Sequence, residues 1–191
     1  CVRLRMSADT KNMFNPKKNA GLECSEIQAF VAYDSNVHPV GRIAGIINHR
    51  ANEKWKTQNV RFGFFDFVDD LEVSSALLEA VIQWGKERNT TSIQGPMGIT
   101  DFDKEGMLVE DFDRLGSMNT YYNYAYYPQH MEALGYEKEV DWVQVRIQIP
   151  SEIPTKYARV ARLSKEMFDL KVKKITDKDI KCSVSVAYGA T

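Results

Sequence analysis

The spacing of apolar positions in the first third of the chain is typical of β-strands. β-prone apolar runs cover Ile27–Tyr33, Val40–Ile47 and Val60–Val68, the last of them rich in phenylalanine. The polar residues Asp34-Ser35-Asn36 are typical of a turn, so the first two runs are predicted to form an antiparallel hairpin. Residues 48–59 are polar without an apolar period and are predicted to loop out.

The next segment changes to a helical period. Its apolar or small residues fall near one face of a helix: Leu71, Ser74, Leu77, Leu78, Val81, Ile82 and Trp84. Asp69, followed by Glu72 three residues later, is an N-terminal capping pattern, and Arg88 and Asn89 supply the stop.

The second half of the chain alternates short elements with a long connection. Ser92–Gln94 is predicted to be a short strand that ends at Gly95-Pro96. Met97–Asn123 is predicted to be irregular, and long loops of this kind in compact domains are often functional. Pro128 suits the first turn of a short helix ending at Gly135. Tyr136–Ile149 alternates apolar and polar residues and is predicted to be a long strand.

Beyond Pro150 the pattern changes again. A helix is predicted from Pro154 through Tyr157, Val160, Leu163 and Phe168. Leu170–Ile175 is a further strand candidate, and Asp177 is suited to cap another helix.

Composition narrows the class of protein. The 191 residues suit one domain, or one domain and the edge of another. A net charge of −1 predicts no broad attraction to nucleic acid or to an anionic membrane, and no run of about 18 apolar residues predicts a membrane span. Cys1, Cys24 and Cys182 are odd in number and widely spaced, which favours a reducing, cytoplasmic location over a disulfide framework or a zinc site. No signal peptide is visible, although a start at Cys1 leaves a lost leader open.

Three segments, taken in order, resemble the GNAT superfamily of N-acyltransferases. Pro39–Gly45 is similar to the second hairpin strand of that family, Ser75–Trp84 to the helix after the acyl-CoA-binding strand, and Tyr127–Tyr136 to the late helix that ends in glycine and an aromatic residue. Further segments resemble a bacterial subgroup of GNAT-like proteins: Asn15–Asn19, Gly41–Ile43, Gly95–Met97 and Gly106–Glu110.

The resemblance implies an α/β fold in layers, with a mixed, mostly antiparallel sheet flanked by helices. It places a GNAT-like domain over residues 1–150, with its core at about 27–148. Residues 151–191 would be a linker helix and, because Leu170–Ile180 resembles the opening of a GNAT unit, the start of a second one.

The resemblance also implies acetyl-CoA or another acyl-CoA as cosubstrate. The strand edge at Phe64–Phe67 would pair with the pantetheine arm, although these phenylalanines also suit an ordinary core. The residues implied to bind the cofactor are Phe65, Phe67, Val68, Val73, Ser74 and Ser75.

The predicted phosphate loop departs from the family. Asp69–Ser74 has no glycine and holds three carboxylates, where the family needs glycines so that backbone N–H groups can approach phosphates. Like charges at such range cost about 1 kcal/mol each or more when partly desolvated, whereas the helix dipole supplies only about half a charge. Either CoA binds weakly, or its phosphates are met elsewhere, or this unit does not bind CoA, and the acids simply cap the helix.

The catalytic candidates are Tyr127 and Asp66. The family often has a tyrosine, acting as general acid, four residues before the terminal glycine, but here that position is Met131, so Tyr127 or Tyr126 would have to reach in from the start of the helix. Asp66 is the candidate base if its side chain faces the cleft, and otherwise a surface carboxylate. A run of tyrosines suits a ligand cleft or loop packing: Tyr121, Tyr122, Tyr124, Tyr126 and Tyr127.

No metal site is predicted. The histidines His38, His49 and His130 are scattered and are interpreted as solvated or as satisfied core side chains. Asp101–Gly106 only partly matches a calcium loop and is interpreted as solvated.

Two kinds of function follow. The first is an enzyme that transfers an acyl group from CoA to a small-molecule or peptide amine, and the second is a non-catalytic GNAT-like ligand-binding or scaffold module. A homodimer is compatible with the sequence. Both the enzyme and the cleft-binding hypothesis require the sheet to splay beside Phe65–Val68 and open a cleft toward Leu71. Because Tyr127 precedes a proline, its backbone is predicted to be extended.

Overall fold

The computed structural model describes residues 8–117 and 120–170. Its contacts divide the chain into two units, Cys1–Gln144 and Val145–Thr191, which are described separately. Cys1 and Cys182, the predicted strand after Leu170 and the predicted cap at Asp177 lie outside the described residues.

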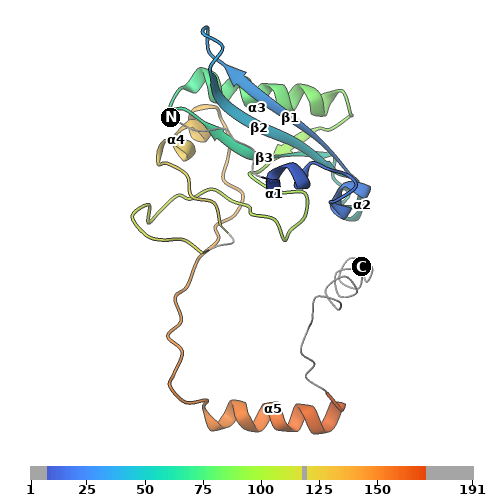
Figure 1. The fold of residues 1–191 in the computed structure, drawn as a ribbon, viewed down its shortest axis with the longest axis vertical. Coiled ribbons are helices and arrows are strands. Elements are labelled where there is room, and N and C mark those ends of the chain that lie inside the picture. The colour runs from blue at the N-terminus through green and yellow to red at the C-terminus, as the bar shows by residue number, and fades with distance from the viewer. Residues whose placement is uncertain (1–7, 118–119, 171–191) are drawn as a thin grey trace. The chain divides into compact units, whose positions relative to one another are not determined.

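The first unit is built on a four-stranded sheet in the order β1-β2-β3-β4 (Figure 1). The first two junctions, β1–β2 and β2–β3, are antiparallel, and β3–β4 is parallel. The fold class is therefore mixed α/β with a mostly antiparallel sheet, as predicted. The strands span Ser25–Tyr33 (β1), Pro39–Asn48 (β2), Asn59–Phe67 (β3) and Ser92–Gln94 (β4).

Helix α3, Leu71–Lys86, packs on this sheet through Leu77, Leu78 and Val81, all buried. Gly41 of β2 permits the close approach, because a Cβ there would lie 2.8 Å from the Leu77 side chain. The predicted cap is off by one residue. Asp70 is the N-cap, and its Oδ1 accepts a hydrogen bond from the Glu72 amide at 2.9 Å.

The predicted loop at 48–59 is partly wrong, because it contains helix α2, His49–Trp55. The Asn48 side chain caps this helix by accepting from the Ala51 amide, and Lys56 ends it in a left-handed conformation. None of its residues is buried, so the sequence has no apolar period there to reveal a helix. The remaining short helices of this unit are α1 (Ala8–Met13), the 3-10 helix η1 (Ala20–Glu23) and α4 (Tyr126–Ala133).

A β-bulge in β3 rearranges its phenylalanines. Gly63 pairs with Ala44 but Asp66 pairs with Arg42, so two residues of β3 oppose one of β2. Phe64, inside the bulge, has a φ of 52°. The extra residue lets β3 contribute three rings to one aromatic cluster, with centroid separations of 5.5 and 4.5 Å along the series Phe62, Phe65 and Phe67.

The predicted long strand over Tyr136–Ile149 is wrong. Neither the part before Gln144 nor the part after it has a strand partner among the described residues. Its large apolar side chains are exposed, because an alternating pattern forms a strand only where a neighbour supplies hydrogen bonds.

The second unit contains helix α5, Thr155–Phe168, which confirms the helix predicted after Pro154. No described helix combines the length and apolar character that crossing a membrane requires.

Candidate functional site

The candidate site lies where β3 loses its neighbouring strand. Pairing of β3 with β4 covers only Asn59–Arg61 and Ser92–Gln94, and one more bond follows, from the Met97 amide to the Phe62 carbonyl at 2.8 Å. Beyond this point Phe65–Phe67 have no strand on this side in the described chain. The two strands therefore do not stay paired beside Phe65–Phe67, as the predicted splay requires.

Two tyrosine hydroxyls occupy the open edge. Tyr126 Oη donates to the Phe67 carbonyl at 2.6 Å, and the Phe67 amide donates to Tyr127 Oη at 3.3 Å. Both tyrosines come from α4, and their rings lie 5.6 and 4.4 Å from the Phe67 ring. The structure therefore differs from the predicted open cleft, since side chains satisfy the backbone groups that a ligand would meet.

Asp66 lies between a neutral donor and a cation. Tyr127 Oη donates to Asp66 Oδ1 at 2.8 Å, and Arg42 Nη2 lies 3.7 Å from Asp66 Oδ2. The Asp66 side chain is 31% exposed, whereas Tyr127 is almost fully buried. The two catalytic candidates from the sequence thus contact each other directly.

Burial, the hydrogen bond to Asp66 and the charge of that carboxylate raise the pKa of the Tyr127 hydroxyl far above its usual value, with the Phe67 amide opposing them. Tyr127 therefore keeps its proton at neutral pH. Burial also raises the pKa of Tyr126.

The predicted extended backbone of Tyr127 is wrong. Helix α4 begins at Tyr126, so Pro128 is its third residue and Tyr127 is helical. A proline in the first turn is tolerated because its missing N–H has no intrahelical acceptor there.

A second polar chain joins α3 to α4. Ser74 Oγ lies 2.9 Å from His130 Nδ1, and His130 Nε2 lies 3.0 Å from Asp69 Oδ1. These residue types match a nucleophile triad, but Ser74 has no exposed surface and its Oγ also donates to the Leu71 carbonyl at 3.0 Å. The Ser74 proton thus goes to the Leu71 carbonyl and not to His130, so His130 does not act as a base on Ser74. The chain is a structural link, and His130 is a satisfied core histidine as predicted.

The residues implied to bind a cofactor do not converge on one surface. Phe65, Phe67 and Val73 pack in or against the core, and Ser74 is buried. Val68 is partly exposed, and its amide donates to the Val40 carbonyl, so its backbone N–H already has a partner on β2. Ser75 Oγ donates to Glu79.

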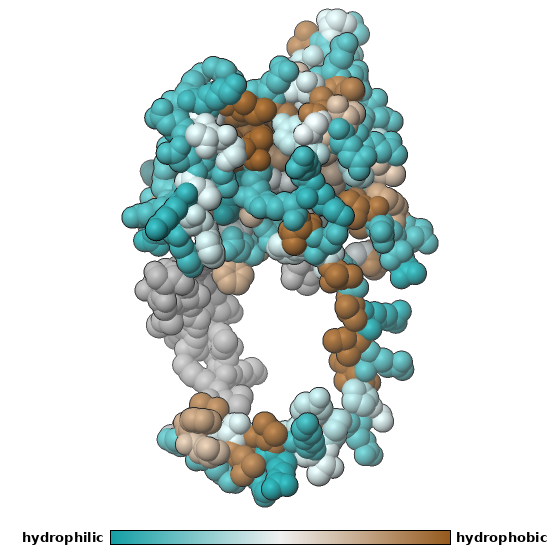
Figure 2. Space-filling view, turned by 180° about the vertical axis from the view of Figure 1, so that it is seen from behind, coloured by the Kyte–Doolittle hydropathy of each residue, from teal (hydrophilic) through white to brown (hydrophobic). Residues whose placement is uncertain are grey.

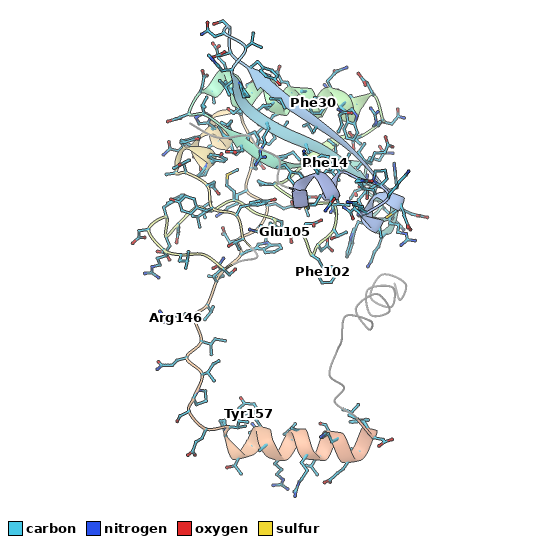
Figure 3. All side chains as sticks on the ribbon, in the orientation of Figure 1. Phe14, Phe30, Phe102, Glu105, Arg146 and Tyr157 are labelled. Carbon is cyan, nitrogen blue, oxygen red and sulfur yellow. The ribbon has the colours of Figure 1, made fainter. Side chains whose placement is uncertain are left out.

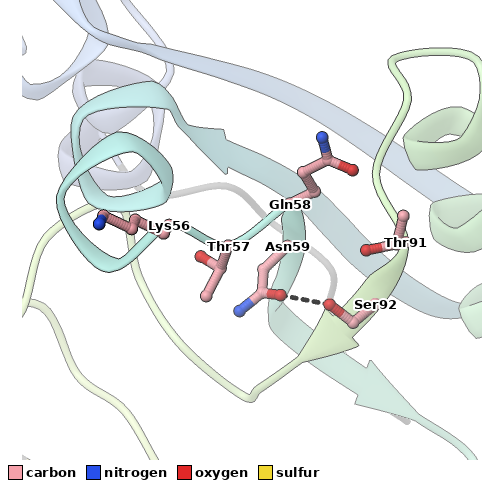
Figure 4. A pocket seen from close by; sticks show the side chains of 6 residues that line it. All are labelled: Lys56, Thr57, Gln58, Asn59, Thr91 and Ser92. Atoms are coloured by element: carbon pink, nitrogen blue, oxygen red, sulfur yellow. Dashed lines mark hydrogen bonds between the residues drawn. The ribbon is translucent and has the colours of Figure 1, made fainter.

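Two surface hollows lie elsewhere. One of about 560 Å³ sits at the start of β3 and β4, where polar side chains line it and Ser92 donates to Asn59 (Figure 4). The other, about 360 Å³, is lined by residues of α3 and by Leu134. Asp66 and Tyr127 line neither. Within 8–117 and 120–170 no three His, Cys, Asp or Glu side chains gather in a way that could hold a metal ion.

Comparison with known proteins gives two curated relatives. The chain is 32% identical over 131 residues to Protein YghO of Escherichia coli (66% of this chain, 33% of that protein). It is 26% identical over 140 residues to the Bacterial ceramide synthase of Caulobacter vibrioides (73% of this chain, 36% of that protein). The chain thus spans about a third of the length of these relatives. No family model matches.

Among solved structures the chain is similar to one named "Putative acetyl transferase from Pyrococcus furiosus", with 17% identity and a TM-score of 0.40 over 76% of this chain and 83% of that one. A TM-score this low supports no argument about function.

Proposed function

We propose that this chain belongs to an N-acyltransferase that moves an acyl group from a thioester, acyl-CoA, to an amine. The relative named for ceramide synthesis supports the reaction class, because ceramide is the amide of a fatty acid and a long-chain amino alcohol. A long-chain amino alcohol is accordingly the acceptor we propose. The observation on which the proposal rests is the hydrogen-bonded pair of Asp66 and Tyr127 at the open end of β3.

In the proposed reaction the Asp66 carboxylate takes a proton from the amine as its nitrogen attacks the thioester carbon. The carbon–sulfur bond breaks and the thiolate leaves, taking a proton from Tyr127. Tyr127 then recovers a proton from Asp66, so one proton passes in total from the amine to the thiol. The Phe67 amide, on the same open edge, is the donor suited to the developing oxyanion once Tyr127 turns toward the sulfur.

Burial, the largest cause of the raised pKa of Tyr127, opposes its role as an acid, but the smaller part that Asp66 causes changes during the proposed reaction. Part of the increase comes from the negative charge of Asp66. When Asp66 has gained the amine proton, that charge is gone, so Tyr127 becomes a better acid at the moment the thiolate leaves.

The phosphate end of CoA does not fit the start of α3. Asp70 Oδ1 already accepts the hydrogen bond of the Glu72 amide, and the carboxylates of Asp69 and Glu72 add negative charge. The donor's phosphates would therefore have to be met by other parts of the protein.

A second candidate function is a ligand-binding module without catalysis. The observation that favours it is the same acidic, glycine-free start of α3, together with tyrosine hydroxyls that already satisfy the Phe67 backbone.

The test is amide formation from an acyl-CoA and a long-chain amino alcohol by the 191-residue chain. We expect Asp66→Asn to lower kcat about a hundredfold, the scale of one general base. Asp113→Asn, which removes an exposed carboxylate of the long loop, is the matched control and should change nothing. Absence of any amide product would contradict the enzyme proposal for this chain and favour the binding module, whereas full activity in Asp66→Asn would reject Asp66 as the general base.

A further inference from the structure

Helix α5 separates apolar from polar side chains around its circumference. At about 100° per residue, its large apolar residues cluster on one side and recur every three or four positions. They are Tyr157, Val160, Leu163, Met167 and Phe168. Figure 2 shows apolar and polar side chains next to each other along this helix, and Figure 3 labels Tyr157 at its start.

Three of the four cations of α5 lie on its polar side, Arg159, Arg162 and Lys165, whereas Lys156 falls among the apolar residues in the first turn. The helix has four cationic side chains against one carboxylate, Glu166, although the whole chain has a net charge of −1. Arg162 forms the only ion pair within the helix among the described contacts, at 4.0 Å from Glu166. The other cations are Lys156, Arg159 and Lys165.

The apolar side of α5 is exposed in the described chain. Tyr157 is 65% exposed and Met167 is 73% exposed. Helix α3 shows the opposite arrangement, because its apolar residues Leu77, Leu78 and Val81 are buried. The sheet of the first unit thus covers the apolar face of α3, whereas no described residue of the second unit buries the apolar face of α5.

We infer that α5 binds flat on the surface of an anionic lipid bilayer, with its apolar side among the acyl chains and its cations at the lipid phosphates. An exposed apolar face bordered by lysine and arginine, on a helix of low overall hydropathy, is the pattern of an interfacial helix. At 14 residues the helix is about 21 Å long, too short to cross a hydrocarbon core of about 30 Å. The positive charge is concentrated on α5, so the net charge of −1 for the whole chain does not reveal this basic helix.

Charge complementarity selects this occupant over a second copy of the chain. A second copy of α5 carries the same excess of positive charge, four cations against one carboxylate, and like charges oppose that association. An anionic bilayer offers the opposite charge and an apolar layer beneath it. The inference does not depend on the acyltransferase proposal, because it concerns only α5.

The experiment is co-sedimentation of the 191-residue chain with vesicles, either purely zwitterionic or containing about 30% anionic lipid. We expect binding at least tenfold tighter to the anionic vesicles, weakened by high salt. Arg159→Glu with Arg162→Glu should weaken binding at least tenfold. Lys17→Glu with Lys18→Glu, the same charge change on exposed residues of the first unit, is the matched control and should bind as the parent does.

Each other result overturns the inference. Equal binding to both vesicle types, no binding, or an equal effect of the two double variants would show that α5 does not recognise the anionic surface. Leu163→Asp gives a further check. If it lowers the unfolding temperature of the chain in the absence of lipid, or dissociates a dimer, then protein covers the apolar side of α5.

Discussion

At the scale of single residues, the Tyr127 hydroxyl joins a carboxylate and a backbone amide at the open edge. It donates to Asp66 and accepts from the Phe67 amide, and the neighbouring Tyr126 donates to the Phe67 carbonyl. Both residues are tyrosines on adjacent positions of α4, so they form a natural pair for comparison.

We expect Tyr127→Phe to lower the free energy of unfolding by about 1–2 kcal/mol, because a buried amide loses its acceptor. If the chain is an acyltransferase, turnover should also fall about a hundredfold. Denaturant titration and the amide assay measure the two effects. Tyr126→Phe is the control and should leave turnover within a few-fold. Equal loss of turnover in both variants would show that the hydroxyls only maintain structure.

The sequence could identify Asp66 and Tyr127 as candidates but not their contact. The two residues are 61 positions apart, and only the packing of α4 beside β3 brings them within 2.8 Å. The same holds for Ser74 and His130, which are 56 positions apart. Contacts between distant positions leave no period in one sequence, so only the residue types could be predicted.

At the scale of elements, Gly63 fixes where the chain after β4 can run. A Cβ on Gly63 would collide with the Met97 carbonyl oxygen, a backbone atom that cannot move aside as a flexible side chain can. Gly63 also precedes the bulge at Phe64. The last bond between the two segments, from Met97 to Phe62, lies next to it.

We therefore expect Gly63→Ala to destabilise the fold by about 2–4 kcal/mol, in the upper part of the range for single substitutions. Gly116→Ala is the control, since only the end of the Thr120 side chain comes near a Cβ there, at 3.1 Å. Urea unfolding of both variants measures the difference. A stability for Gly63→Ala equal to that of the control would mean that Met97 shifts at little cost.

The acidic residues at the start of α3 lead to a second prediction at the scale of elements. Acetyl-CoA should bind with a Kd weaker than about 1 µM, or less than about 8 kcal/mol of binding free energy. If charge is the cause, Asp69→Asn with Glu72→Gln should tighten binding, while Glu79→Gln, two turns further along α3, should not. Calorimetric titration at moderate salt measures this, and a sub-micromolar Kd for the parent chain would contradict it.

Strands with a neighbour in the sheet and helices with a regular apolar period were predicted well, and these helices include α5, which buries none of its residues. The β1–β2 hairpin and α3 each show an apolar period against the core, and their bounds agree within a few residues. Helix α2 buries nothing and was predicted as loop. Tyr136–Ile149 has a strand pattern but no neighbour, because pairing depends on parts of the fold that a local pattern does not report.

At the scale of the whole molecule, the core cluster lies entirely within the first unit, between Phe30 and Tyr136. We expect a chain ending at Gln144 to fold cooperatively, with an unfolding midpoint within about 3 °C of the full chain, since a change of 1 kcal/mol moves the midpoint by about 2–4 °C near this size. Thermal unfolding followed by circular dichroism measures it. A midpoint lower by 10 °C or more would show that residues after Gln144 stabilise the first unit.

Gly41 also limits which sequence changes the protein can accept near the site. It pairs with Phe67 across the sheet, and a Cβ on it would lie 2.8 Å from Leu77 Cδ1 and 3.0 Å from Val73 Cγ1. Any larger residue at position 41 would raise the first turns of α3 away from the end of β3. The distances between Asp69, His130 and the tyrosines would then change although none of them had been altered. A homologue that replaces Gly41 would therefore have to compensate at Val73 or Leu77, and paired changes at these positions are where selection on the site should be visible.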